Sequence, residues 1–130
     1  MDIKDFIAGF ERKEEGVEVF ISDNFPKFTL KAINAGKDKA LRKEATRKVR
    51  GKDEIDVNKY QDALIVETVI SPNFKSTEVQ TALKVMGAEA VLNLFTAGEY
   101  LELLTKVSDI NGFTVDGVKK REEDEEEIKN

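Results

Sequence analysis

The stretch 96-TAGEYLELLTKVSDINGF-113 carries the clearest fold signal in this chain. Thr96 and Glu99 have capping-box spacing, in which each side chain bonds the backbone N–H of the other residue. Apolar residues then recur on one helical face, at Leu103, Leu104, Val107 and Ile110. The pair Asn111-Gly112 is typical of a helix end at which the glycine takes left-handed geometry. We therefore predict a helix over 97–111.

Two longer helices are predicted upstream. A helix over 37–50 rests on a narrow apolar stripe with basic flanks, formed by Leu41, Ala45 and Val49. A helix over 58–71 begins at Asn58, with Gln61 in capping-box spacing. It is apolar around much of its circumference, so we expect it to be the central buried helix. Pro72 disfavours helical geometry in the residue before it and is expected to end this helix.

Two shorter helices follow Pro72 in the prediction. Thr77 can cap the first, over 77–86, because Gln80 stands three residues later and Gly87 supplies a stop. The second runs over 88–95 and carries several apolar residues.

The N-terminal part combines a short amphipathic helix with a β-hairpin over 17–34. Apolar residues have helical spacing at Ile3, Phe6, Ile7 and Phe10. Residues then alternate with period two on both sides of the turn 23–26, which is typical of a hairpin. An isolated hairpin is marginal in water, so it must pack on helices or another strand. We predict a mainly α, α+β fold with this hairpin on a small helical bundle, forming one globular domain over 1–115.

Composition excludes several kinds of chemistry. The 130 residues contain no Cys, His or Trp, so disulfides, thiolate nucleophiles and histidine proton shuttles are all missing. We expect no catalytic residues, no cofactor and no metal site, and hence no enzyme. The longest uncharged stretch, 90–98, is far shorter than the roughly 20 residues of a membrane helix. Acidic residues near the N-terminus argue against a signal peptide, so we expect a cytoplasmic protein.

The net charge of −5 hides a strong segregation of charge. The block 37–52 contains eight basic and two acidic residues, whereas 116–130 is largely charged and includes six consecutive acids over 122–127. A segment of this composition cannot form a core, so we predict a charged flexible tail over 116–130.

Two candidate partner-binding surfaces follow. The basic one contains Arg42, Lys43 and Arg47, and three occupants are open: an acidic protein, the chain's own acidic tail, or nucleic acid. Nucleic acid is the weakest of them, because the block lacks an aromatic side chain for base stacking and the whole chain is acidic. The apolar candidates are Tyr100, Leu103 and Leu104. Such residues are more often core, yet they can also line a groove for another amphipathic helix.

The order of these signals resembles the XkdN-like tail assembly chaperones of long-tailed phages and prophages. The resemblance covers roughly 17–113. It rests on the hairpin, the charged helix with 40-ALRK-43 and the segment 72-PNF-74, followed by 98-GEY-100 and the closing 110-INGF-113. The marks it shares are structural and comprise Pro72, Phe74, Thr96, Gly98, Glu99 and Gly112.

This resemblance implies a non-catalytic chaperone that binds the tape measure protein and helps recruit tail tube subunits. It further implies a protein of the host cytoplasm that is absent from the finished virion, with self-association possible through exposed apolar faces. The alternative is a small nucleic-acid-binding or regulatory phage protein acting through the basic helix 37–52.

Overall fold

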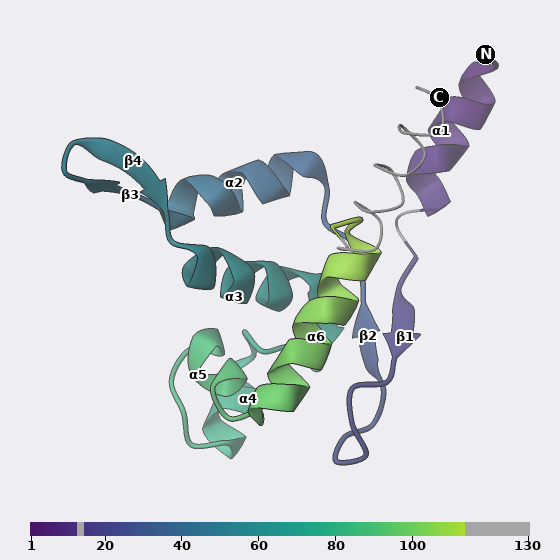
Figure 1. The fold of residues 1–130 in the computed structure, drawn as a ribbon. Coiled ribbons are helices and arrows are strands. Elements are labelled where there is room, and N and C mark those ends of the chain that lie inside the picture. Colours follow the sequence, from purple (N-terminus) through teal and green to yellow (C-terminus); the bar gives the residue numbers. More distant parts are fainter. Residues whose placement is uncertain (13–14, 114–130) are drawn as a thin grey trace, which may run out of the picture.

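A computed structural model of the protein describes residues 1–12 and 15–113; the predicted tail over 116–130 lies outside the described residues. The helices are α1 (Ile3–Arg12), α2 (Ala35–Ala45), α3 (Val57–Thr68), α4 (Thr77–Ala82), α5 (Ala88–Leu92) and α6 (Ala97–Ile110). The strands are β1 (Val17–Val19), β2 (Phe28–Leu30), β3 (Thr46–Val49), β4 (Lys52–Ile55) and β5 (Val69–Ser71). The predicted α+β, mainly helical fold is confirmed. Helix α1 and the β3–β4 hairpin lead away from the body on opposite sides (Figure 1).

The predicted N-terminal hairpin is present and belongs to a three-stranded antiparallel sheet of order β1-β2-β5. Val17 pairs with Leu30 across the hairpin, and Leu30 also pairs with Val69 of β5. Phe28 and Leu30 are buried, so β2 is the central strand both in order and in burial. The third strand supplies the neighbour that a two-stranded hairpin needs in water.

Helix α3 differs at both ends from the helix predicted over 58–71. Its N-cap is Asp56, whose side chain accepts a bond from the Lys59 N–H at 3.1 Å, so the predicted Asn58 cap is wrong. The helix ends at Thr68, because the β-branched residues that follow pair with β2 as strand β5. Pro72 therefore follows a strand and does not end a helix. The expected central burial is confirmed by Leu64, Ile65 and Val66.

The prediction of one helix over 37–50 is wrong in its second half. Helix α2 ends at Ala45, and residues 46–55 form the antiparallel hairpin β3–β4. Arg50 and Gly51 have φ of +53° and +79°, which matches a two-residue turn with both central residues left-handed. Pairing with 52–55 outweighs the helix propensity of 46–49. Val49, predicted to extend the apolar stripe of α2, lies on β3 instead.

Helices α4 and α5 are shorter than predicted over 77–86 and 88–95. Ser76 is the N-cap of α4, so the predicted Thr77 cap is wrong. The Gln80 side chain donates to the Phe74 carbonyl at 2.9 Å and accepts from the Gly87 N–H at 2.9 Å. Gln80 thus holds the loops on either side of α4 instead of completing a capping box.

Four phenylalanine rings join the separate elements into one core. Phe25 follows β1, Phe28 lies on β2, Phe74 follows β5 and Phe95 precedes α6. Their ring centroids lie 5.3 to 6.2 Å apart in five pairs. Phe74, one of the residues on which the family resemblance rests, is almost completely buried, so its role here is in packing. The cluster ties the sheet to the N-terminal end of α6.

The predicted capping box of α6 is confirmed. The Thr96 hydroxyl accepts from the Glu99 N–H at 3.1 Å, and Glu99 Oε1 accepts from the Thr96 N–H at 3.0 Å. Glu99 Oε2 also accepts from the Ser22 hydroxyl at 2.7 Å and from the Asn24 side-chain amide at 2.9 Å. One carboxylate therefore caps its own helix and holds the β1–β2 loop. Gly98 has no steric need for glycine, since an added Cβ would meet nothing within 4 Å.

These hydrogen bonds predict a specific acid sensitivity. The Ser22 hydroxyl, the Thr96 N–H and the Asn24 amide together hold the pKa of Glu99 at about 2, below its ordinary value of 4.5. Because the folded-state pKa is the lower one, this stabilisation is complete above about pH 4.5 and is lost as the pH falls towards 2. Urea unfolding should show stability declining more steeply over this range in the wild type than in Glu99→Gln.

The matched control for this pH series is Glu102→Gln, which removes a carboxylate of the same helix outside the Ser22–Asn24 network. We expect this variant to keep the wild-type slope. Equal slopes in the wild type and Glu99→Gln would contradict the assignment.

The C-terminal end of α6 has the predicted left-handed cap. Gly112 has φ of +81° and its N–H donates to the Asp109 carbonyl at 3.1 Å, while the Phe113 N–H donates to the Ser108 carbonyl at 2.8 Å. These two bonds make a complete Schellman motif. The motif turns the chain so that Phe113 returns alongside α6.

Asn111, just before this glycine, joins three elements. Its Oδ1 accepts from the Ile33 N–H at 2.9 Å, and its Nδ2 donates to the Thr68 hydroxyl and the Val107 carbonyl, each at 3.0 Å. Thr68 is fully buried at the junction of α3 and β5. Asn111 therefore connects α6 to the end of α3 and to the segment after β2.

Candidate partner-binding site

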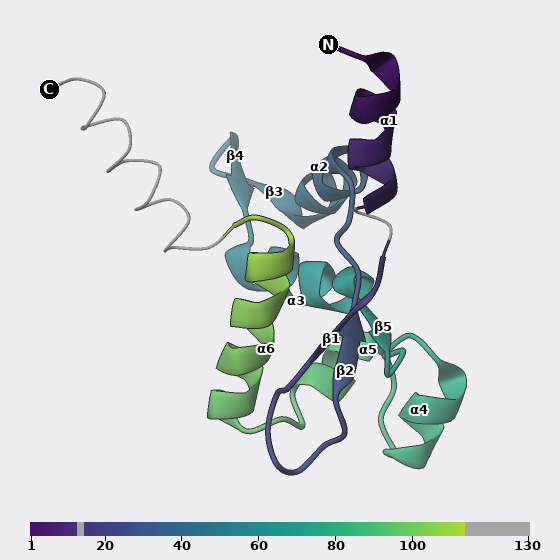
Figure 2. The ribbon, with the colours of Figure 1, turned by 90° about the vertical axis from the view of Figure 1, so that its right-hand side faces the viewer.

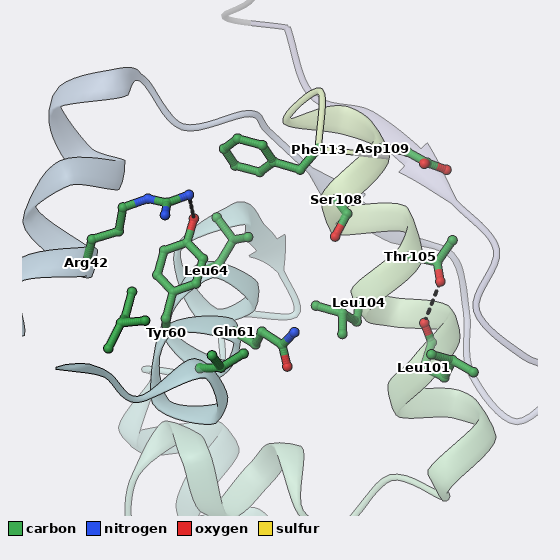
Figure 3. Close-up of a pocket in the computed structure, with 12 residues that line it drawn as sticks. Arg42, Tyr60, Gln61, Leu64, Leu101, Leu104, Thr105, Ser108, Asp109 and Phe113 are labelled. Atoms are coloured by element: carbon green, nitrogen blue, oxygen red, sulfur yellow. Dashed lines mark hydrogen bonds between the residues drawn. The ribbon is translucent and has the colours of Figure 1, made fainter. Parts of the chain in front are cut away.

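An open groove with a volume of about 640 Å³ lies between α3 and α6. Its lining comes from α2, β4, α3, α6 and the turn after α6, and comprises Arg42, Ile55, Val57, Tyr60, Gln61, Leu64, Leu101, Leu104, Thr105, Ser108, Asp109 and Phe113. Figure 3 shows the Arg42 guanidinium beside the Tyr60 hydroxyl, and Gln61 and Leu64 of α3 on the same side of the groove, across from the α6 side chains. Seven of the twelve lining residues are apolar or aromatic, and the polar ones are Arg42, Gln61, Thr105, Ser108 and Asp109.

The α6 wall uses a different face of the helix from the one that builds the core. Glu99, Leu103 and Val107 are buried, whereas Leu101 is 63% exposed and Leu104 is partly buried. Leu101, Leu104, Thr105 and Ser108 are spaced by three or four residues, so they share one stripe along α6. The helix thus presents an apolar face to solvent beside its buried face.

The opposite wall begins with a cluster of Arg42, Asp38 and Tyr60. Arg42 Nε donates to Asp38 Oδ2 at 2.8 Å, and the Tyr60 hydroxyl donates to Asp38 Oδ1. The Arg42 guanidinium also lies 4.6 Å from the Tyr60 ring centroid. Burial, with the bond to Asp38, raises the pKa of Tyr60 to about 12. The phenol therefore stays protonated near neutral pH. The hydrogen bonds of the cluster hold the Arg42 guanidinium in place beside the groove.

Phe113 closes the groove near Arg42. Its ring centroid lies 5.9 Å from the Arg42 guanidinium carbon, and 44% of the residue is exposed. The left-handed helix end at Gly112 was expected, but the placement of the Phe113 ring beside α2 was not. The turn that ends α6 thereby places the Phe113 side chain in the groove lining.

The basic block 37–52 does not form one basic face. Arg47 lies directly opposite Glu54 across the β3–β4 hairpin, and Lys48 lies opposite Asp53. Opposite charges in such cross-strand pairs are favourable. The hairpin therefore brings acids from just beyond the block next to its cations. The continuous basic helix on which the nucleic-acid alternative depended is absent from 37–52.

The structure brings some of the predicted contact residues together and separates others. Arg42 and Leu104 line the same groove, while Lys43 is exposed on α2 and Arg47 is exposed on β3, 4.0 Å from Asp56. Leu103 is fully buried, so it belongs to the core and is not accessible to a partner.

Tyr100 is partly buried and is held by a single polar contact. Its hydroxyl donates to Asp62 at 2.6 Å, and burial followed by this bond raises the pKa of Tyr100. This bond links α6 to α3. Tyr100 therefore holds the helix pair together and does not line the groove.

Sequence reasoning missed the other ten lining residues, among them Val57, Tyr60, Gln61, Leu101 and Phe113. Leu101 had a usable signal, since it falls outside the buried stripe of α6 yet is apolar. Within 1–12 and 15–113, no three acidic side chains gather as a metal site would require. In the same part of the chain, no helix has the length and apolar character needed to cross a membrane.

A small α+β fold with an open groove between two helices has the geometry in which helix-in-groove proteins receive an amphipathic helix. The chain belongs to the XkdN-like phage tail assembly chaperone family, whose family model matches residues 3–129.

Two relatives from Bacillus subtilis (strain 168) support this membership. The phage-like element PBSX protein XkdN is 31% identical over 143 residues, covering 99% of this chain and 94% of the relative. The protein YqbN is 35% identical over 131 residues, covering 88% and 87%. The crystal structure of YqbN superposes with a TM-score of 0.64 at 34% identity, covering 76% of this chain and 86% of that chain. The predicted resemblance is confirmed.

Proposed function

We propose that this tail assembly chaperone is non-catalytic and binds a helical segment of the tape measure protein in the α3–α6 groove. The observation that carries the proposal is the apolar lining of the two walls, formed chiefly by the exposed Val57, Leu101 and Phe113 and the partly buried Leu104. An amphipathic helix that lays its apolar face into such a groove removes both surfaces from water. Covering a client in this way keeps its apolar stretches from aggregating.

Polar groups at the groove edges would orient the client helix. Arg42 contributes a cation to the lining and Asp109 contributes a carboxylate. Gln61 lies between the walls, where its amide can bond a polar residue on the bound face. A client helix with opposite charges at the matching positions would be preferred, because electrostatic complementarity selects register more than it adds affinity.

We further propose that the β3–β4 hairpin is the second contact and recruits a tail tube subunit. The hairpin projects away from the body (Figure 1), and its cations are exposed, namely Arg47, Lys48, Arg50 and Lys52. Within 46–55 only Val49 is partly buried. A two-stranded sheet has free strand edges and is marginal alone, so a partner surface would stabilise it.

The protein would act in the host cytoplasm and be absent from the finished virion.

Co-expression with the tape measure protein of the same phage tests the groove. We expect the wild-type chain to raise the soluble fraction of the tape measure protein severalfold, measured by quantitative immunoblotting of cleared lysate. Leu101→Glu should abolish this gain, because it places a charge on the apolar wall that the client must cover.

The matched control is Leu94→Glu. Leu94 is 55% exposed and lies outside the groove lining, so the variant adds the same charge at a comparably exposed leucine without touching the site. It should retain the wild-type gain. If the wild-type chain did not raise the soluble fraction of the tape measure protein, the chaperone proposal would be wrong. If both variants lost this effect equally, the groove would not be the binding site.

A further inference from the structure

Helix α1 carries a stripe of large apolar side chains that the body leaves exposed. The exposed fractions are 71% for Ile3, 55% for Phe6, 49% for Ile7 and 56% for Phe10. These four positions share one helical face, which an amphipathic helix ordinarily buries. Figures 1 and 2 both show α1 leading away from the rest of the chain. A 10-residue helix is marginal by itself in water, so removing this exposed apolar face from water would stabilise it.

The spacing of the stripe is complementary to itself. The intervals between its members are three, one and three residues, which read the same in both directions. A second α1 laid antiparallel, with a twofold axis between Phe6 and Ile7, therefore places Ile3 against Phe10 of the second copy. The same operation places Phe6 against Ile7 of the second copy. Each contact joins an aliphatic side chain to an aromatic one, and none leaves an apolar residue opposite a gap.

The charges beside the stripe agree with this antiparallel arrangement. Lys4 and Glu11 are seven residues apart, nearly two full turns, so they lie on one flank of the stripe. In an antiparallel pair the equivalent flanks meet, which brings Lys4 of each copy alongside Glu11 of the other. Antiparallel helix dipoles are also mutually favourable. A parallel pair would place both protein bodies at the same end of the helices, where they would crowd one another.

We propose that α1 is a self-association helix that pairs antiparallel with α1 of a second copy of this chain. The contact is isologous and closed, because the same stripe serves both partners. It uses neither the α3–α6 groove nor the β3–β4 hairpin, so the dimer leaves both surfaces accessible. The inference is independent of the tape measure proposal.

Sedimentation equilibrium of the purified full chain tests the pairing. We expect a concentration-dependent monomer–dimer equilibrium in the wild type and at least a tenfold weaker dimer in Phe6→Glu, because a charge then enters the apolar contact. Leu94→Glu is the matched control, since both positions are 55% exposed and both variants gain one negative charge. Its dissociation constant should equal that of the wild type. Unchanged urea midpoints would show that Phe6→Glu leaves the body folded.

Single-cysteine cross-linking tests the orientation, because the natural chain contains no cysteine. Ile7→Cys lies next to the twofold axis and should form a symmetric disulfide on mild oxidation. Ile3→Cys should not, because the two copies of residue 3 would be about 10 Å apart along the axis, beyond disulfide reach. A wild-type protein that stays monomeric at millimolar concentration, a dimer that survives Phe6→Glu, or faster cross-linking at residue 3 would each overturn the proposal.

Discussion

Phe74→Ala is expected to lower the free energy of unfolding by about 3–5 kcal/mol, as for other buried aromatic residues truncated to alanine. Phe74 is 1% exposed and its ring packs edge-on against Phe28 and Phe95, at centroid distances of 6.1 and 5.9 Å. Truncation removes both ring contacts and leaves a cavity where the β5 loop, β2 and the start of α6 meet. Because domains of this size are stable by only about 5–15 kcal/mol, the variant would be close to unfolding.

Urea denaturation followed by circular dichroism measures this loss, with Phe25→Ala as the matched control. Phe25 belongs to the same ring cluster but is 36% exposed, so its truncation opens a site that water can fill. Its expected loss is about half that of Phe74→Ala or less. Similar losses in the two variants would show that the cluster, and not the burial of Phe74, determines stability.

Asn111→Ala is expected to lower the free energy of unfolding by about 2–4 kcal/mol. The substitution leaves the Ile33 N–H without its acceptor and the Thr68 hydroxyl without its donor. Each unsatisfied group in a poorly hydrated place costs about 1–3 kcal/mol. Both groups lie where α6, α3 and the end of β2 converge, so the loss would loosen the connection that positions both groove walls.

Asn93→Ala is the matched control for this substitution. Asn93 is also the C-cap residue of a helix, α5, but it is exposed and its side chain lies outside this network. Its change in stability should stay within about 0.5 kcal/mol, as is usual at surface sites. A loss in Asn111→Ala no greater than that in Asn93→Ala would refute the role of this network.

Most elements of the fold could be predicted from local signals, and the two helix-for-strand errors share one cause. The capping box at Thr96, the end of α6 at Gly112 and the buried face of α3 all depend on residues close in sequence. Residues 46–49 and 69–71 were predicted as helix because their apolar or basic residues fit a helical period, but both segments pair as strands. Gly51 suits a left-handed turn position, but Arg50 is not typical of the other one, and Val69–Ser71 becomes a strand only because β2 lies beside it.

The candidate site was only partly predictable. Arg42 and Leu104 reach the groove as expected, but the choice between Leu101 and Leu103 required knowing which side of α6 faces the core. Both residues are leucines on the same helix, two positions apart, and they differ only in what packs against them. Tyr60 and Phe113 join the site through contacts spanning α2, α3 and the turn after α6, which no local pattern reveals.

The sequence alone determined the helical character of this protein, the chemistry it lacks and its membership of the tail assembly chaperones. These properties follow from residue identity, short-range spacing and the order of signals along the chain. Only the tertiary structure decided that the basic block folds back on nearby acids, that Glu99 holds the β1–β2 loop, and that α6 has an exposed apolar face beside its buried one. Each of these depends on which distant segments come into contact. The free energies of burial and strand pairing arise from those contacts, so the residues alone do not determine them.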